Sequence, residues 1–484
     1  MANKIIELQP AFNPINPKRG EDKERHGFDL YTVPVLRQVL LWRHSRTIFQ
    51  LILLVAAAGV IFDGFFGSQL APRNFATVGS WIDYRFLLVM VILLVGNLFC
   101  MSCPFVLVSH SIQKRVGLNR VWPRWLKGKW VALGLLIVIL FSYEQLSLWD
   151  SPALTATVTV IYFAGAVLTD FVFKGNAFCK YVCPLGLFNQ TYAMLSPTEV
   201  KSRSLTMCKS CTTKECVKGD AHTHQEGCQM SLYMGTKASN IDCTYQMSCA
   251  RACPYNNVGF QLRNPVRELW TNVKKRDLSV GAAALVLGFA ALTNAGSMIG
   301  PFGDFEKWVG NTTGIHDNFW NYTLIFLFFT VALPSLVGWL VTWLTQKLAR
   351  SPEPLEAIFK RYALGLLPLS FSFWIAHYLF HFSIGAKAFW PTIQDMFVRL
   401  GLPIFGQPNY STGTILPYEF VNPFQIFIIY VGLMTSGVAI YQISRKMYKK
   451  KVARRAFLPF MALALVLAVI GVLIMMQPMQ ARGA

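Results

Sequence analysis

Eleven cysteines in this chain stand at the short intervals that metal centres use. Four of them form two pairs, Cys100-x2-Cys103 and Cys179-x3-Cys183, and a proline follows the second cysteine of each pair. The other seven lie in one polar stretch, at Cys208, Cys211, Cys216, Cys228, Cys243, Cys249 and Cys253. Thiolates at such spacing, ending in Cys-Pro, are typical of iron–sulfur clusters, so the pattern predicts electron transfer.

The seven later cysteines divide into two ligand sets if they follow the bacterial two-cluster ferredoxins. In those proteins the fourth cysteine of each run ligates the cluster of the other run. One predicted [4Fe–4S] cluster therefore has four thiolates, from Cys208, Cys211, Cys216 and Cys253. The other has three, from Cys228, Cys243 and Cys249.

The three-thiolate set lacks a cysteine because Gln246 stands at the second position of its run. Three thiolates suit a [3Fe–4S] cluster, or a [4Fe–4S] cluster with a ligand other than cysteine. The nearby candidates for that ligand are Asp242, Gln246, His222 and His224. A zinc site built from Cys208, Cys211 and the two histidines is the less favoured alternative.

The paired cysteines lie at the ends of apolar segments. If those segments pack together, Cys100, Cys103, Cys179 and Cys183 form a site with four sulfur ligands. Such a site suits a third [4Fe–4S] cluster, zinc or copper, and ligand type alone does not choose among them. Buried free cysteines are the simpler alternative.

The elements that must position these thiols are mostly membrane spans. Hydrophobic residues make up 54% of the 484-residue chain, far more than a soluble domain buries. Nine segments are long enough to cross a bilayer, near 47–66, 85–108, 130–149, 153–173, 278–298, 319–345, 358–383, 423–443 and 457–476. We expect an all-α polytopic membrane protein that carries a two-cluster ferredoxin-like α+β insert.

Basic residues predict the orientation of these spans. Lysine and arginine concentrate in alternate connections, such as 110–129 and 445–455, whereas the connections between them are poor in basic residues. By the positive-inside rule the N-terminus is cytoplasmic, the C-terminus is outside, and all eleven cysteines lie on the cytoplasmic face. The predicted parts are a cytoplasmic arm (1–46), four spans (47–173), the cytoplasmic iron–sulfur insert (174–277), five spans (278–476) and a periplasmic tail (477–484).

The motifs resemble those of the membrane polyferredoxins represented by NapH, NosR and CcoG. The resemblance covers about residues 45–260 and rests on Phe-Cys-Met-Ser-Cys-Pro-Phe (99–105) and Cys-Lys-Tyr-Val-Cys-Pro-Leu-Gly (179–186). It implies a protein of the bacterial cytoplasmic membrane that carries electrons between the quinone pool or a cytoplasmic donor and a periplasmic enzyme. It also implies the alternative of redox work in metal-cofactor assembly.

His377 and His381 stand four residues apart on the seventh predicted span, hence on one helix face. Polar side chains inside a span indicate function by default. One hypothesis gives the two histidines a function, as a quinol site or as a copper site with Met475, Met476 and Met479. The simpler hypothesis is that they form hydrogen bonds between helices.

These observations favour one function over two others. We expect an electron-transfer subunit, not a self-contained enzyme, whose partners are the lipid bilayer, quinol or a cytoplasmic donor, and a membrane or periplasmic oxidoreductase. A copper-reducing or assembly factor is the alternative, and a transporter with vestigial clusters is the third. The net charge of +21 does not indicate nucleic-acid binding, because the basic residues flank spans.

Overall fold

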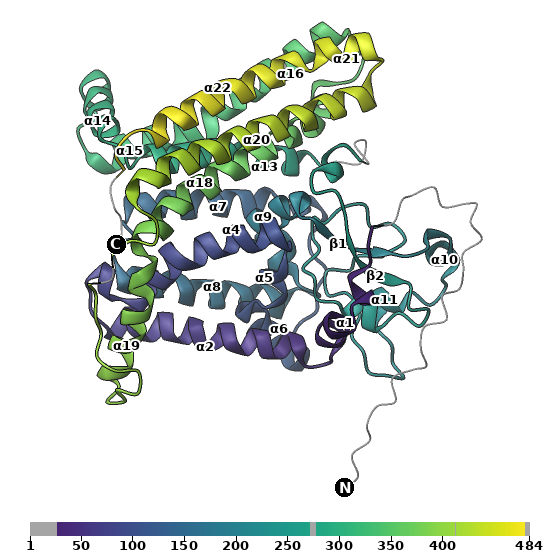
Figure 1. The fold of residues 1–484 in the computed structure, drawn as a ribbon. Coiled ribbons are helices and arrows are strands. Elements are labelled where there is room, and N and C mark those ends of the chain that lie inside the picture. The colour runs from purple at the N-terminus through teal and green to yellow at the C-terminus, as the bar shows by residue number, and fades with distance from the viewer. Residues whose placement is uncertain (1–26, 272–276, 412, 480–484) are drawn as a thin grey trace.

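The computed structural model describes residues 27–271, 277–411 and 413–479, and its regular structure is almost entirely helical (Figure 1). Within those ranges the only sheet has two antiparallel strands, β1 (Thr198–Ser202) and β2 (Val258–Leu262). The fold is therefore a helical bundle with one small α+β region at one end.

Eight helical segments of the described ranges are long and apolar enough to cross a bilayer. They are α2 (Ser45–Phe66), α3 to α4 (Phe75–Leu94), α8 (Pro152–Val172), α13 (Leu278–Gly296), α15 to α16 (Asn318–Ala349), α17 to α19 (Leu355–Arg399), most of α20 (Tyr418–Met447) and α21 to α22 (Lys450–Met475). The shorter apolar helix α7 (Trp130–Gln145) corresponds to the remaining one of the nine predicted spans. These helices fit a polytopic membrane protein, as the sequence predicts.

Several of the long segments are composite. Their parts are α3 (Phe75–Thr77), η3 (Val78–Tyr84) and α4 (Arg85–Leu94); α15 (Asn318–Leu327), η9 (Phe328–Ala332) and α16 (Leu333–Ala349); α17 (Leu355–Tyr362), η10 (Ala363–Leu366), α18 (Leu367–Gly385), η11 (Ala386–Ala388) and α19 (Phe389–Arg399); and α21 (Lys450–Ala456) and α22 (Leu458–Met475). The wide turns η3 and η9 interrupt the regular hydrogen-bond ladder, as π-type turns inside longer helices do.

The connections gather at two opposite ends of the bundle (Figure 1). One end carries the sheet with α1 (Pro34–Leu41), α10 (Leu205–Ser210) and α11 (Glu215–Lys218). The basic helix α21 lies at this same end. The other end carries α14 (Gly300–Thr313) and α19, and there Ile299 pairs with Met479 beyond α22.

The second span differs from the expected 85–108. Helix α4 ends at Leu94, and the chain turns through Gly96, at φ +113°, before α5 (Leu98–Met101) and α6 (Pro104–Val116). A Cβ on Gly96 would lie 2.8 Å from the Tyr245 hydroxyl, so only glycine fits here. Apolar residues continue through this break, which is why hydropathy alone does not reveal it.

Helix α18 forms the centre of the bundle. It is apolar and buried all round, as expected of a helix enclosed by others. It packs on α13, α20, α22 and α4. Trp374 anchors it by donating from its indole nitrogen to the Leu287 carbonyl at 3.2 Å.

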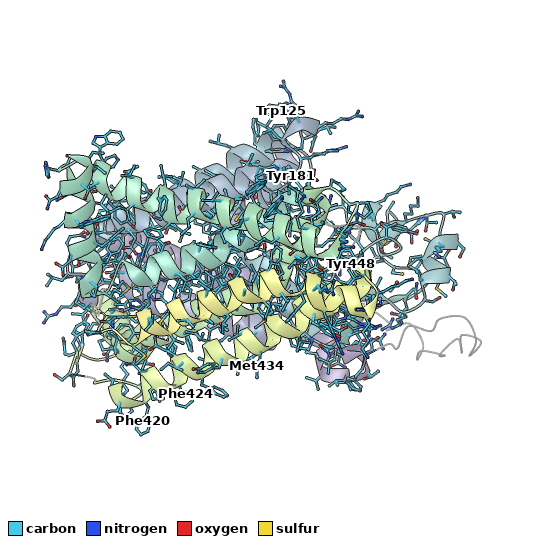
Figure 2. All side chains as sticks on the ribbon, turned by 90° about the horizontal axis from the view of Figure 1, so that it is seen from above. Trp125, Tyr181, Phe420, Phe424, Met434 and Tyr448 are labelled. Carbon is cyan, nitrogen blue, oxygen red and sulfur yellow. The ribbon has the colours of Figure 1, made fainter. Side chains whose placement is uncertain are left out.

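The outer surface of the bundle is apolar. Figure 2 shows Phe420, Phe424 and Met434 directed away from α20. Met434 is 74% exposed and Phe424 50% exposed, values that a water-facing helix would not tolerate along its length. Side chains like these fit contact with lipid.

The α+β region begins later than residue 174 and includes part of the N-terminal arm. Helix α9 (Pro184–Tyr192) and η6 (Ala193–Leu195) are buried in the bundle, where Phe188 packs on Trp374. The arm adds to the sheet, since the Leu262 amide donates to the Phe28 carbonyl at 2.8 Å. The remaining short elements are η1 (Leu30–Thr32), η2 (Ala71–Arg73), η4 (Arg124–Leu126), η5 (Phe178–Val182), α12 (Ser248–Arg251) and η7 (Arg267–Trp270).

The substitution Gly96→Ala should lower the thermal stability of the detergent-solubilised protein. Its Cβ enters the space of Tyr245 and its φ is left-handed, which together cost about 1–3 kcal/mol. A melting curve followed by circular dichroism measures the loss. Gly134→Ala is the matched control, because nothing lies within 4 Å of that Cβ and a mid-helix alanine should be neutral or stabilising. Equal melting temperatures for the wild type and Gly96→Ala would contradict this role.

Candidate metal centre

Both Cys-Pro pairs place a cysteine at the start of a helix. Cys103 is the N-cap of α6, Cys183 is the N-cap of α9, and the following proline begins each helix. Proline suits this position because it lacks the amide hydrogen that a first turn leaves unpaired. The Gly186 amide donates to Cys183 Sγ at 3.1 Å. Each helix therefore directs its positive end toward a sulfur, which favours a thiolate or a negatively charged metal centre.

The other cysteine of each pair lies on a short irregular turn. Cys100 lies on α5, and Asn189 Nδ2 approaches its Sγ at 3.5 Å. Cys179 lies on η5, whose first amide, that of Phe178, donates to Asp170 at 3.0 Å. Buried polar side chains of α8 and α9 thus fix both turns.

The structure brings these four thiols together. Cys179 lies within electrostatic range of Cys100, Cys103 and Cys183. Gly186 lines the same place, since a Cβ there would lie 3.3 Å from Cys183 Sγ and 3.1 Å from the Cys179 carbonyl. We call this set the membrane-proximal group, and a side chain larger than that of glycine at position 186 would press against its sulfur and backbone atoms.

A second set, the outer group, lies in the α+β region. Its members influence one another electrostatically; they are Cys208, Cys211, Cys216 and Cys253. The Asn257 side chain donates to Cys208 Sγ at 3.2 Å, and the Asn257 amide donates to Cys253 Sγ at 3.4 Å. Burial, together with the neighbouring thiols, raises the pKa of Cys216 to about 11, so a thiolate there requires a positive partner such as iron.

The third set, the middle group, consists of Cys228, Cys243 and Cys249. Cys249 lies within electrostatic range of the other two and also of Cys216 in the outer group. Cys243 and Cys249 are buried. The middle group is therefore enclosed between the outer group and the bundle.

Two side chains connect the middle group to the membrane-proximal group. Arg46 interacts electrostatically with Cys179, Cys103 and Cys228. Asn97 Nδ2 donates to the Cys243 carbonyl at 3.0 Å. The three groups thus follow one another from the α+β region to the bundle. The sequence analysis missed these two residues, because nothing in their local pattern distinguishes them from other polar residues beside a span.

No three His, Cys, Asp or Glu side chains converge on a single-ion position in residues 27–271, 277–411 and 413–479. In a tetrahedral zinc site with Zn–S bonds of about 2.3 Å, the sulfurs lie only about 3.8 Å apart. The thiols of each group interact electrostatically without converging in this way.

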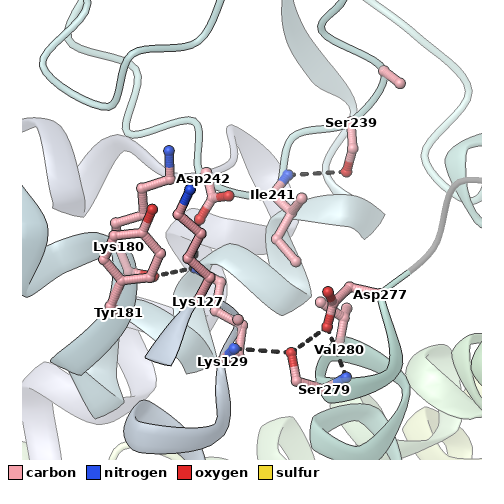
Figure 3. Close-up of a pocket in the computed structure, with 12 residues that line it drawn as sticks. Lys127, Lys129, Lys180, Tyr181, Ser239, Ile241, Asp242, Asp277, Ser279 and Val280 are labelled. Carbon is pink, nitrogen blue, oxygen red and sulfur yellow. Dashed lines mark hydrogen bonds and ion pairs between the residues drawn. The ribbon is translucent and has the colours of Figure 1, made fainter. Parts of the chain in front are cut away.

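A cavity of about 300 Å³ is lined by the residue that follows Cys179 and the residue that precedes Cys243 (Figure 3). Its lining includes Lys127, Lys129, Lys180 and Asp242. Lys129 is buried and forms an ion pair with Asp242, and it donates to the Lys180 carbonyl at 2.7 Å. Because Lys180 follows Cys179, this cavity is next to the thiols. In the sequence, Lys129 is one of the basic residues of the connection 110–129, which predicts orientation only.

The predicted histidine pair lies elsewhere. His377 and His381 are buried in α18 with ring centroids 5.0 Å apart. In the described ranges they have no third His, Cys, Asp or Glu that would complete a metal site with them. Of the methionines proposed with them, Met475 accepts a hydrogen bond from Gln425 at 3.3 Å.

The fold and these thiols define a helical membrane protein with clustered cysteines. A family model described as a 4Fe-4S binding domain matches residues 81–132 and 155–201. Each matched stretch contains one Cys-Pro pair, and the match ends before the seven later cysteines. The match supports an iron–sulfur protein. Comparisons with curated proteins and with solved structures find no match.

The substitution Cys183→Ser should remove the membrane-proximal cluster, with a loss of about four irons per chain. Serine keeps the N-cap but is a poor ligand for iron, so the fold should remain. Iron and acid-labile sulfide analysis of anaerobically purified protein measures the change. Ser102→Ala is the control, since Ser102 lies between Cys100 and Cys103 and its hydroxyl donates to the Leu98 carbonyl at 3.4 Å, away from the sulfurs' ligand role. An unchanged iron content in Cys183→Ser would show that this group holds no cluster.

Proposed function

We propose that this protein carries electrons between a partner in the cytoplasm and the membrane, through three iron–sulfur clusters held by the outer, middle and membrane-proximal groups. The observation that carries the proposal is the consecutive order of the groups. Cys216 neighbours Cys249, and Arg46 joins Cys228 to Cys103. Neighbouring redox sites in a row are what an electron relay requires.

The surroundings of the groups support a directional relay. Clusters exchange single electrons at potentials set by hydrogen bonds to sulfur, burial and ligand charge. Sulfur atoms of the outer group accept hydrogen bonds from several N–H groups, such as the Lys214 amide, which donates to Cys211 Sγ at 3.4 Å. Cys211 is also partly exposed to solvent. In the middle group Cys243 and Cys249 are buried. These surroundings favour different potentials for the outer and middle groups and leave the outer one accessible to a soluble partner.

The membrane end of the relay has room for a small redox partner. The cavity in Figure 3 combines lysine and aspartate side chains with Tyr181, and it adjoins the residue after Cys179 and the residue before Cys243. A quinol head group requires polar partners of this kind at the membrane surface. We therefore place quinol exchange at this cavity in preference to the buried His377 and His381.

The distribution of charge supports the orientation predicted from the sequence. The thiol groups and the basic helix α21 lie at the same end of the bundle. Basic connections remain in the cytoplasm. The proposed location is therefore the bacterial cytoplasmic membrane with the clusters on its inner face, and the acceptor is a membrane or periplasmic oxidoreductase. The resemblance to the NapH, NosR and CcoG group supports the same location and the same kind of acceptor.

The alternative of copper handling has less support. A copper ion would use the sulfurs of Cys100, Cys103, Cys179 and Cys183, the same four ligands that a cluster would use. The family match to a 4Fe-4S binding domain covers the same four cysteines.

Membrane vesicles test the relay and its orientation together. In inverted vesicles, dithionite added outside should bleach the cluster absorbance at once and produce reduced-state EPR signals, and an added quinone should then reverse both changes. Sealed right-side-out vesicles should respond slowly, because dithionite crosses the bilayer poorly. Equal rates in the two preparations would contradict the orientation. Clusters that are present but not reoxidised by quinone would contradict quinol exchange.

Charge reversal near the outer group should slow electron exchange with an acidic soluble carrier. Lys209 and Lys218 are exposed on α10 and α11, the helices that also hold Cys208 and Cys216. The double variant Lys209→Glu with Lys218→Glu should lower the association rate about tenfold at low salt, and the difference should shrink as salt screens the charges. Stopped-flow absorbance measures these rates.

Lys307→Glu is the control for this surface. Lys307 is 80% exposed but lies on α14 at the opposite end of the bundle. Its reversal should leave the exchange rate unchanged. If both variants slow exchange equally, the outer group is not the docking point.

A further inference from the structure

Gln246 has a buried side chain that the protein itself does not satisfy. It is only 6% exposed, and neither its Oε1 nor its Nε2 has a hydrogen-bond partner among the described residues. Each buried polar atom left without a partner costs about 1–3 kcal/mol. A side chain kept in this state indicates a partner that the polypeptide does not supply.

The backbone holds Gln246 in place from both sides. Tyr245 and Met247 have left-handed φ values of 51° and 56°, which are unfavourable for residues other than glycine. Both neighbours are anchored: the Tyr245 hydroxyl accepts from Asn240 at 2.9 Å, and the Tyr31 hydroxyl contacts Met247 Sδ at 3.1 Å. Strained backbone that is fixed by its surroundings is typical of functional sites.

The position of Gln246 in the chain matches that of a cluster ligand. It stands three residues after Cys243 and three residues before Cys249. These are the intervals of the ferredoxin run, in which the middle residue is a cysteine. Cys243 and Cys249 both belong to the middle group with Cys228, the group that has one thiolate too few.

The other candidates for the missing ligand are engaged or exposed. Asp242 forms an ion pair with Lys129 beside the cavity in Figure 3. His222 and His224 are exposed, in a turn closed by pairing of Asp220 with Gln225. Gln246 is therefore the one sequence candidate that is both buried and unsatisfied.

We propose that Oε1 of Gln246 binds the fourth iron of a [4Fe–4S] cluster whose other irons are held by Cys228, Cys243 and Cys249. This inference rests on the proposed function, because it assumes that the middle group holds a cluster. An amide oxygen is neutral and a weaker ligand for iron than a thiolate. The site should therefore have a higher potential than a four-thiolate cluster, and its amide-bound iron should be the first to leave on oxidation.

Variants of Gln246 test the assignment by EPR and iron analysis, without any measurement of activity. Brief oxidation of the wild type should yield a [3Fe–4S] signal that added ferrous iron and reductant reverse. Gln246→Cys supplies a fourth thiolate, so the same oxidation should give little or no such signal, and the midpoint potential of this cluster should fall. Gln246→Leu should carry the [3Fe–4S] signal as purified and contain about one iron fewer per chain.

Two controls distinguish this role from a general structural one. Gln225→Leu, in the exposed turn of the same region, and His222→Ala should both behave as the wild type. Cys228→Ser should abolish the signal that the Gln246 variants alter, which assigns that signal to the middle group. A wild type that shows a stable [3Fe–4S] cluster under strict anaerobiosis, or a Gln246→Leu variant that matches the wild type, would overturn the proposal.

Failure of this inference is distinguishable from failure of the relay. If the Gln246 variants change no signal while quinone still reoxidises the clusters, the ligand assignment is wrong and the relay stands. If the variants alter the [3Fe–4S] signal as expected but quinone causes no reoxidation, the ligand assignment stands and the electron route is wrong.

Discussion

A close contact at Gly96 holds the membrane bundle against the iron–sulfur region. After α4 the chain turns at Gly96, where the missing side chain makes room for the Tyr245 hydroxyl. The next residue, Asn97, donates to the Cys243 carbonyl at 3.0 Å. The same turn leads into α5 and so fixes the place of Cys100. A single break in a span therefore sets the relation between the membrane-proximal and middle groups.

The thiols of the membrane-proximal and middle groups are close together and partly or fully buried, so their charges must be balanced by the protein. Thiolates in a low-dielectric region repel one another and resist ionisation. Arg46 lies among Cys179, Cys103 and Cys228, and the amino ends of α6 and α9 point at sulfur. Positive partners are thus placed where negative charge would gather, and this arrangement favours clusters over free thiols.

The potential of each cluster should follow from its place in the fold. Asn257 and backbone amides donate to sulfurs of the outer group, which is nearest to solvent. In the middle group Cys243 and Cys249 are buried, and the proposed fourth ligand, Gln246, is a neutral amide. The membrane-proximal group lies at the amino ends of two helices. Three different environments give the chain a means of setting the direction of electron flow.

Local pattern in the sequence determined the chemistry and most of the spans. The spacing of cysteines, the length of apolar segments and the positions of basic residues can be read along the chain. They therefore predicted the iron–sulfur class, the helical membrane fold and the replacement of one expected cysteine ligand by Gln246. The tertiary structure alone decided the break at Gly96, the pairing of Asp242 with Lys129, and the order of the three groups. Those features depend on contacts between residues far apart in the chain, such as Arg46 with Cys228, and no local pattern records such contacts.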